Sequence, residues 1–163
     1  MEILFSPWRH AYVTSAKEDA GRCILCRIFE SGDDESNLVL LRAPLNFVLI
    51  NRFPYNSGHL MIVPNRHCAS LSALTSGERA ELIELTGRAE TILQTDYAAQ
   101  GFNMGINLGI PAGAGIPGHL HLHIVPRWAG DTNFMTVVGE TRLLPEDVAT
   151  TFSRLLPRFQ AIA

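Results

Sequence analysis

The chain has 163 residues, of which 47% are hydrophobic and 18% charged, and its formal net charge at pH 7 is -3. This composition is typical of a globular protein, excludes a disordered one and offers no basic surface for a nucleic-acid duplex. No apolar run is long enough to span a membrane, and no basic, apolar leader marks a signal peptide. Three cysteines, two of them in a C-x-x-C, do not make a secreted disulfide framework. We expect one cytoplasmic domain over residues 1–163.

The first half of the chain predicts an irregular arm over residues 1–20, then a short helix and three strands. The helix runs from Cys23 to about Glu30, and a polar, acidic loop follows over residues 31–37. Strands are predicted where short apolar runs are bounded by turn residues, at Leu38–Leu41, Phe47–Ile50 and His59–Val63.

In the second half, a long helix separates the third and fourth strands. Thr75 and Glu78 have the spacing of a capping box, and apolar residues keep helical spacing as far as about Tyr97. The later elements are a strand at Phe102–Leu108, a glycine-rich loop at 109–118, a strand at 119–125 that Pro126 ends, a short edge strand at Val137–Val138, and a terminal helix from Pro145 within a tail over 141–163. The pattern predicts an α+β fold with about five antiparallel strands.

Three histidines alternate with apolar residues in the last long strand. Alternate side chains of a strand point the same way, at intervals of about 6–7 Å. His119, His121 and His123 are therefore expected on one face, with Leu120 and Leu122 facing a core. A face of three imidazoles is costly to keep unless it binds something.

This histidine pattern resembles the motif of the histidine triad (HIT) superfamily. The likeness extends to residues 48–54, 57–64 and 102–108, and residues 126–134 resemble the bacterial branch that contains diadenosine tetraphosphate phosphorylases, near the Fhit-like hydrolases. The resemblance implies a HIT-like fold and a two-fold homodimer with a continuous sheet. It also implies an enzyme that cleaves dinucleoside polyphosphates, with AMP held covalently on a histidine and no organic cofactor.

Family positions imply roles for the three histidines. His121 matches the nucleophile that attacks the α-phosphorus, and a neutral imidazole suits this because its ordinary pKa is about 6.5. His123 matches the histidine that contacts the phosphate, where it stabilises developing negative charge. His119 is the first histidine of the catalytic triplet. Phosphate and water both stay open as the second acceptor.

The substrate shell carries over only in part. Asn51 matches the residue that contacts the ribose hydroxyls, and Asn107 matches a polar residue near the α-phosphate. Gly115 and Ile116 occupy the phosphate-facing loop where many relatives carry Gln and Ser or Thr. We expect backbone N–H groups of this loop to replace those side chains.

A second group of residues has the pattern of a metal site. Cys23 and Cys26 have zinc-knuckle spacing, and zinc-containing relatives add a histidine after the third strand and the first triad histidine, here His67 and His119. Four protein ligands predict a structural Zn²⁺. The alternative is that both cysteines are ordinary helix residues and His67 is a solvated loop residue.

Other interpretations stay open at this stage. The fold could host a nucleoside phosphoramidate hydrolase, a hydrolase whose catalytic zinc is held by the histidines, or a nucleotide-binding module with little turnover. Trp128 is expected either to stack on an adenine or to belong to a core or interface. Arg127 and Asp131 form either a loop salt bridge or a polyphosphate contact. His59, at the start of a strand, could belong to the dimer or active-site neighbourhood, but a structural role is expected.

Overall fold

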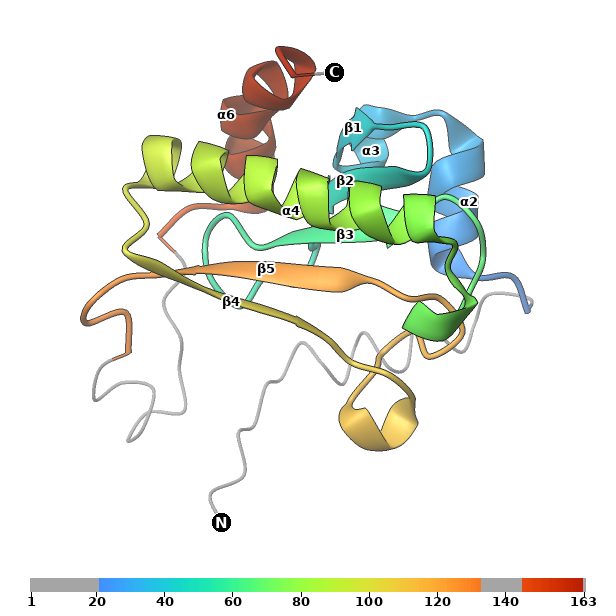
Figure 1. The fold of residues 1–163 in the computed structure, drawn as a ribbon. Coiled ribbons are helices and arrows are strands. Elements are labelled where there is room, and N and C mark those ends of the chain that lie inside the picture. Colours follow the sequence, from blue (N-terminus) through green and yellow to red (C-terminus); the bar gives the residue numbers. More distant parts are fainter. Residues whose placement is uncertain (1–20, 133–144, 163) are drawn as a thin grey trace.

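The computed structural model describes residues 21–132 and 145–162, so the predicted arm over 1–20 and the predicted strand at Val137–Val138 lie outside it. The described residues form one antiparallel sheet in the order β1-β2-β3-β5-β4 (Figure 1). The strands are β1 (Val39–Arg42), β2 (Asn46–Ile50), β3 (Leu60–Pro64), β4 (Gly101–Ile106) and β5 (Leu122–Arg127). The predicted α+β class is confirmed, with the histidine strand β5 inside the sheet and β4 at its edge.

Two long helices lie over one face of the sheet (Figure 1). The helices are α2 (Ile24–Ser31), α3 (Asp34–Asn37), α4 (Ser76–Tyr97) and α6 (Val148–Gln160), with short 3-10 turns η1 (Leu71–Ala73) and η2 (Ile110–Ala112). The predicted capping box is present, because Thr75 accepts from the Glu78 backbone N–H and Glu78 accepts from that of Thr75. It fixes the start of α4 where the sequence indicates.

The two faces of the sheet are covered unequally. Leu60, Ile62 and Ile124 pack beneath α4 and α6 in the main core. On the opposite face, a smaller cluster that includes Leu25 of α2 covers Phe47 and Leu49 on β2, with Val39, Met61 and Val63 from the neighbouring strands. The β5–β4 end of this face carries polar and small residues, since His123 pairs in register with Gly105.

Two predictions about local structure are wrong. Residues 31–37 are not all loop, because Asp33 caps the short helix α3 by accepting from the Ser36 backbone N–H. Pro126 does not end its strand. The carbonyl of Pro126 accepts a hydrogen bond from the Asn56 side chain. The nitrogen and the carbonyl oxygen of one strand residue point to the same side, so the Pro126 nitrogen also faces the β3 side of β5. The pairing of β3 with β5 has already ended at Ile124, so no strand needs an N–H from Pro126. A missing N–H costs nothing there.

The strand boundaries also shift near the site. The predicted strand over 119–125 starts too early, because β5 begins at Leu122. His119 lies in a bend whose N–H donates to the Ile116 carbonyl, and His121 directly precedes the strand. β4 ends at Ile106, which leaves Asn107 just beyond the strand. Met104 lies on β4, the edge strand of the described sheet, and is 42% exposed.

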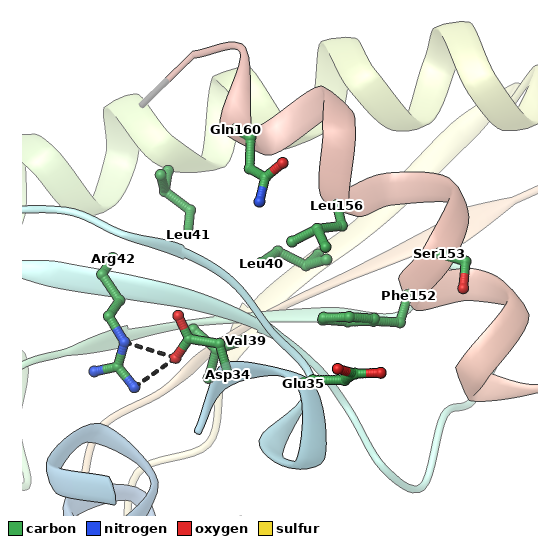
Figure 2. A pocket seen from close by; sticks show the side chains of 10 residues that line it. All are labelled: Asp34, Glu35, Val39, Leu40, Leu41, Arg42, Phe152, Ser153, Leu156 and Gln160. Atoms are coloured by element: carbon green, nitrogen blue, oxygen red, sulfur yellow. Dashed lines mark hydrogen bonds and ion pairs between the residues drawn. The ribbon is translucent and has the colours of Figure 1, made fainter. Parts of the chain in front are cut away.

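An open groove of about 500 Å³ lies at the other end of the sheet, between β1 and α6 (Figure 2). Leu40 of β1 faces Phe152 and Leu156 of α6, and Arg42 pairs with Asp34 at its side. It contains no histidine or cysteine, so the predicted site lies elsewhere. Within the described ranges, no helix has both the length and the apolar character needed to cross a membrane; the cytoplasmic location stays a prediction.

Candidate active site and metal centre

The rings of His121 and His123 lie against each other, and His121 is only 4% exposed. Their ring centroids are 4.9 Å apart and their planes are nearly perpendicular. Nδ1 of His121 is 2.8 Å from the backbone oxygen of His119, a carbonyl that can only accept. The proton of neutral His121 is therefore on Nδ1, and Nε2 keeps the lone pair that a nucleophile needs. Burial lowers the pKa of His121 below its ordinary 6.5, which favours this neutral form.

A fourth histidine sets the proton on His123. Nδ1 of His59 accepts from the Tyr55 backbone N–H at 3.1 Å, so neutral His59 carries its proton on Nε2. That atom is 3.0 Å from Nδ1 of His123. His123 therefore accepts at Nδ1 and carries its own proton on Nε2. The pKa of His123 is lowered to about 4, mainly by burial and to a smaller extent by the electrostatic effect of His121. His123 is therefore a neutral hydrogen-bond donor at physiological pH.

His59 is the functional residue that the sequence prediction missed. It is completely buried, and the Tyr55 ring stacks on it with centroids 4.8 Å apart. A single histidine at the start of a strand gives no sign of this role. The usable signal is that His59 precedes β3, which pairs directly with the histidine strand.

The predicted substrate residues are only partly brought together. Asn51 lies beside the pair, with Nδ2 3.4 Å from Nε2 of His59 and Oδ1 accepting from the Phe53 backbone N–H. Asn107 lies one position beyond the Ile106–Leu122 pair, on the side of His121.

Gly115 and Ile116, the two predicted residues of the glycine-rich loop, lie in different environments. Gly115 is exposed in this loop. Ile116 packs against the Leu25 cluster and lines the cavity beside the cysteines, so its side chain serves that region. The backbone oxygen of Ile116 accepts from the His119 N–H at 3.3 Å.

In the loop after β5, hydrogen bonds position the three side chains whose roles the sequence left open. Asp131 accepts from Arg127 at 2.5 Å and 2.7 Å and from Asn56 at 3.1 Å, so Arg127 and Asp131 form a loop salt bridge. The guanidinium of Arg127 lowers the pKa of Asp131 and keeps it charged. Trp128 donates from Nε1 to the Tyr97 carbonyl at 3.0 Å, which fixes its ring against the end of α4.

The four predicted metal ligands converge at one point. The ligand atoms of Cys23, Cys26, His67 and His119 all lie within 4.8 Å of one another. Cys23 and Cys26 come from the start of α2, His67 from the loop after β3, and His119 from the segment before β5. Sγ of Cys26 is 3.3 Å from Nδ1 of His67 and 3.5 Å from Nδ1 of His119.

The surroundings of the cluster fit a Cys₂His₂ zinc site. Nε2 of His119 is 2.9 Å from the Pro64 carbonyl, which holds a proton there and leaves Nδ1 free to bind a metal. Burial and the neighbouring Cys23 raise the pKa of Cys26 to about 11. A dication between the sulfurs would remove that penalty, because it stabilises both thiolates.

Comparison with known proteins gives the family. A family model described as the HIT domain matches residues 33–130. The chain belongs to the HIT family. The match includes all five strands of the sheet and ends at Gly130, just after β5, so it contains the four histidines around the site. The family predicted from the histidine motif is confirmed.

Two curated proteins are similar in sequence to part of this HIT chain. An AP-4-A phosphorylase of Mycobacterium tuberculosis is 44% identical over 113 residues, which are 69% of this chain and 58% of that protein. A bis(5'-nucleosyl)-tetraphosphatase (asymmetrical) of Schizosaccharomyces pombe is 31% identical over 93 residues, 57% of this chain and 50% of that protein. The matched part thus spans about half the length of these curated relatives.

A solved structure supports the fold. A Zn-bound histidine triad family protein from Mycobacterium smegmatis superposes with a TM-score of 0.70 at 20% identity, and the match covers 86% of this chain and 94% of that one. At this identity the likeness establishes the shared fold.

Proposed function

We propose that this HIT protein cleaves dinucleoside polyphosphates of the diadenosine tetraphosphate type by transferring AMP through His121. The observation that carries the proposal is the 2.8 Å contact between Nδ1 of His121 and the His119 carbonyl, because it leaves Nε2 as the nucleophilic atom. The names of the two curated relatives, a phosphorylase and a tetraphosphatase, support this substrate class.

The reaction balances in two steps. Nε2 of His121 attacks the α-phosphorus, a P–N bond forms, and the bridging P–O bond breaks with its electron pair leaving on ATP. An oxygen of inorganic phosphate or water then attacks the same phosphorus, and the P–N bond returns its electron pair to Nε2. Phosphorolysis yields ADP and ATP, and hydrolysis yields AMP and ATP.

The neighbouring groups supply positioning and charge stabilisation. The Nε2–H of His123 donates to a phosphate oxygen that gains negative charge in the transition state. Asn51 would contact the ribose and Asn107 the α-phosphate, and backbone N–H groups at Gly115 and Ile116 would face the phosphates. A nucleoside phosphoramidate hydrolase uses the same first step and is the nearest alternative.

Rapid quench with α-labelled diadenosine tetraphosphate tests the proposal. We expect a protein-bound AMP adduct that is stable in alkali and labile in acid, and that His121→Ala abolishes. Product analysis with and without inorganic phosphate then identifies the second acceptor. Nucleotide binding with neither adduct nor turnover would instead indicate a binding module.

We also propose that Cys23, Cys26, His67 and His119 hold a structural Zn²⁺. When bound, the ion would cross-link α2 to the segment carrying the nucleophile. The catalytic-zinc alternative has less support, because the metal cluster found among residues 21–132 and 145–162 excludes His121 and His123. Metal analysis of the purified protein should give about one zinc per chain.

We further propose a homodimer that extends the sheet through β4. The strand lies at the sheet edge with Met104 42% exposed, and Leu108 and Ile110 just beyond it are 43% and 73% exposed. Exposed apolar side chains beside an unpaired edge are suited to a second copy of the chain. Light scattering should give twice the chain mass, and Met104→Glu should shift it toward the monomer.

A further inference from the structure

The two thiols of the metal cluster are accessible from solvent. Cys23 and Cys26 are both partly exposed and line an open cavity of about 520 Å³ together with His67. Cys68, the third cysteine, is buried and donates to the Ser70 carbonyl. A small dissolved oxidant can therefore reach the cluster pair and not Cys68.

The same two sulfurs are already neighbours. Cys23 caps α2 and Cys26 lies in its first turn, and both sulfurs approach one atom, Nδ1 of His119, at 3.4 Å and 3.5 Å. The C-x-x-C spacing places both on one helix end. Joining them would need no movement of one element past another.

Resting on the zinc site proposed above, we propose that Cys23 and Cys26 form a peroxide-sensitive pair whose oxidation expels the metal and slows the chemistry at His121. The modification is a disulfide, and the oxidant class is a hydroperoxide. One thiolate attacks the peroxide O–O bond and becomes a sulfenic acid, and the second displaces its oxygen. Overall, two thiolates, H₂O₂ and two protons give one disulfide and two waters, and Zn²⁺ leaves because a disulfide is a poor ligand.

His119 connects the two cysteines to His121. The Nδ1 atom of His119 faces the sulfurs, whereas its backbone carbonyl accepts the proton of His121 that fixes the reactive tautomer. His119 is held by its Nε2 contact to the Pro64 carbonyl and by its backbone, and a bound Zn²⁺ would hold it at Nδ1 as a third attachment. Oxidation removes this third attachment, so the carbonyl is held less firmly and the reactive tautomer is less favoured.

The experiment uses the full-length zinc-loaded protein carrying Cys68→Ser, so that only one intramolecular disulfide can form. Substoichiometric to tenfold hydrogen peroxide is added while a chromophoric chelator records free zinc. We expect one zinc released per disulfide, with both remaining thiols lost. A mass decrease of about 2 Da, from two lost hydrogens, should map to the peptide with Cys23 and Cys26. The rate of AMP adduct formation should fall by about tenfold or more, a size typical of lost support around a metal ligand.

Reduction with a thiol reagent and added zinc should restore the adduct rate. The matched variant Cys23→Ser cannot form the disulfide. After peroxide treatment, its peptide with positions 23 and 26 should therefore not show the 2 Da mass loss. Zinc retained without a disulfide at tenfold peroxide would overturn the inference, as would an unchanged adduct rate after complete oxidation. A purified protein without zinc contradicts the metal site itself, and a zinc protein without AMP adduct contradicts the proposed enzyme, so the failures are distinguishable.

Discussion

Nε2 of His59 lies 3.0 Å from Nδ1 of His123. Because the Tyr55 backbone N–H occupies the other nitrogen of His59, a main-chain group determines which nitrogen of His123 can donate. The Tyr55 ring stacks on His59 and holds that imidazole in place. The nitrogen of His123 that can donate is thus set by Tyr55 and His59, which precede β3.

Replacing His59 should lower the rate without removing the nucleophile. In His59→Ala, His123 loses the donor at Nδ1, and its neutral form is free to carry the proton on the wrong nitrogen. We expect kcat to fall about 10–100-fold with little change in KM. His59→Gln keeps an N–H donor near the same position and should recover part of the loss. Nitrogen NMR of the His123 ring checks the tautomer, and an unchanged tautomer in His59→Ala would contradict the relation.

The partly buried, neutral His123 should make the fold sensitive to acid. Its pKa is lowered to about 4 by burial, whereas an unfolded histidine titrates near 6.5. Between these values the unfolded chain binds a proton that the folded protein does not. The free energy of unfolding therefore falls by about 1.4 kcal/mol per pH unit as the pH drops from 6.5 to 4, and this residue adds no slope outside that window.

Urea unfolding at pH 7.5, 5.5 and 4.5 measures this dependence. His123→Gln removes the titrating group and should make the loss of stability between pH 6.5 and 4 shallower than in the parent. Parallel pH profiles for the two proteins would show that His123 does not contribute. His119 and His121, whose pKa values burial also lowers, act in the same direction and account for slope that remains.

His119 and His121 should differ in what their loss costs. His121→Ala removes the proposed nucleophile and should reduce turnover by about 10³-fold or more, with the melting temperature close to that of the parent. His119→Ala removes one of the four proposed zinc ligands, so it should lower both turnover and stability. A loss of about 2 kcal/mol corresponds to about 4–8 °C in melting temperature for a chain of this size. Calorimetry with metal analysis decides, and equal melting temperatures would speak against zinc.

Gly58, which precedes His59, should not tolerate a side chain. Its φ is +74°, and an added Cβ would lie 2.9 Å from Cδ2 of Leu93. We expect Gly58→Ala to destabilise the protein by about 1–3 kcal/mol and to lower activity by displacing His59. The matched control is Gly87→Ala on the exposed side of α4, where an added Cβ meets nothing within 4 Å. That change should stabilise the helix by about 0.5–1 kcal/mol, and denaturant titration measures both.

The sequence by itself determined the elements whose signals are local. The capping-box spacing of Thr75 and Glu78 predicts the start of α4. The alternation around Leu122 and Ile124 predicts a half-buried strand. Both signals depend on only a few neighbouring residues. Family likeness added the metal set, and Cys23, Cys26, His67 and His119 do converge. Their spacing along the chain could not show that convergence.

Only the tertiary structure decided the roles that depend on which strands pair. His59 gained its contact with His123 because β3 lies beside β5, a pairing across 64 positions of sequence. Pro126 stayed inside β5 because its nitrogen faces a side where no strand pairs. The strand order places β4, and with it the exposed Met104, at the edge of the described sheet. In each case the deciding contact comes from a residue distant in sequence, which local propensity and spacing cannot encode.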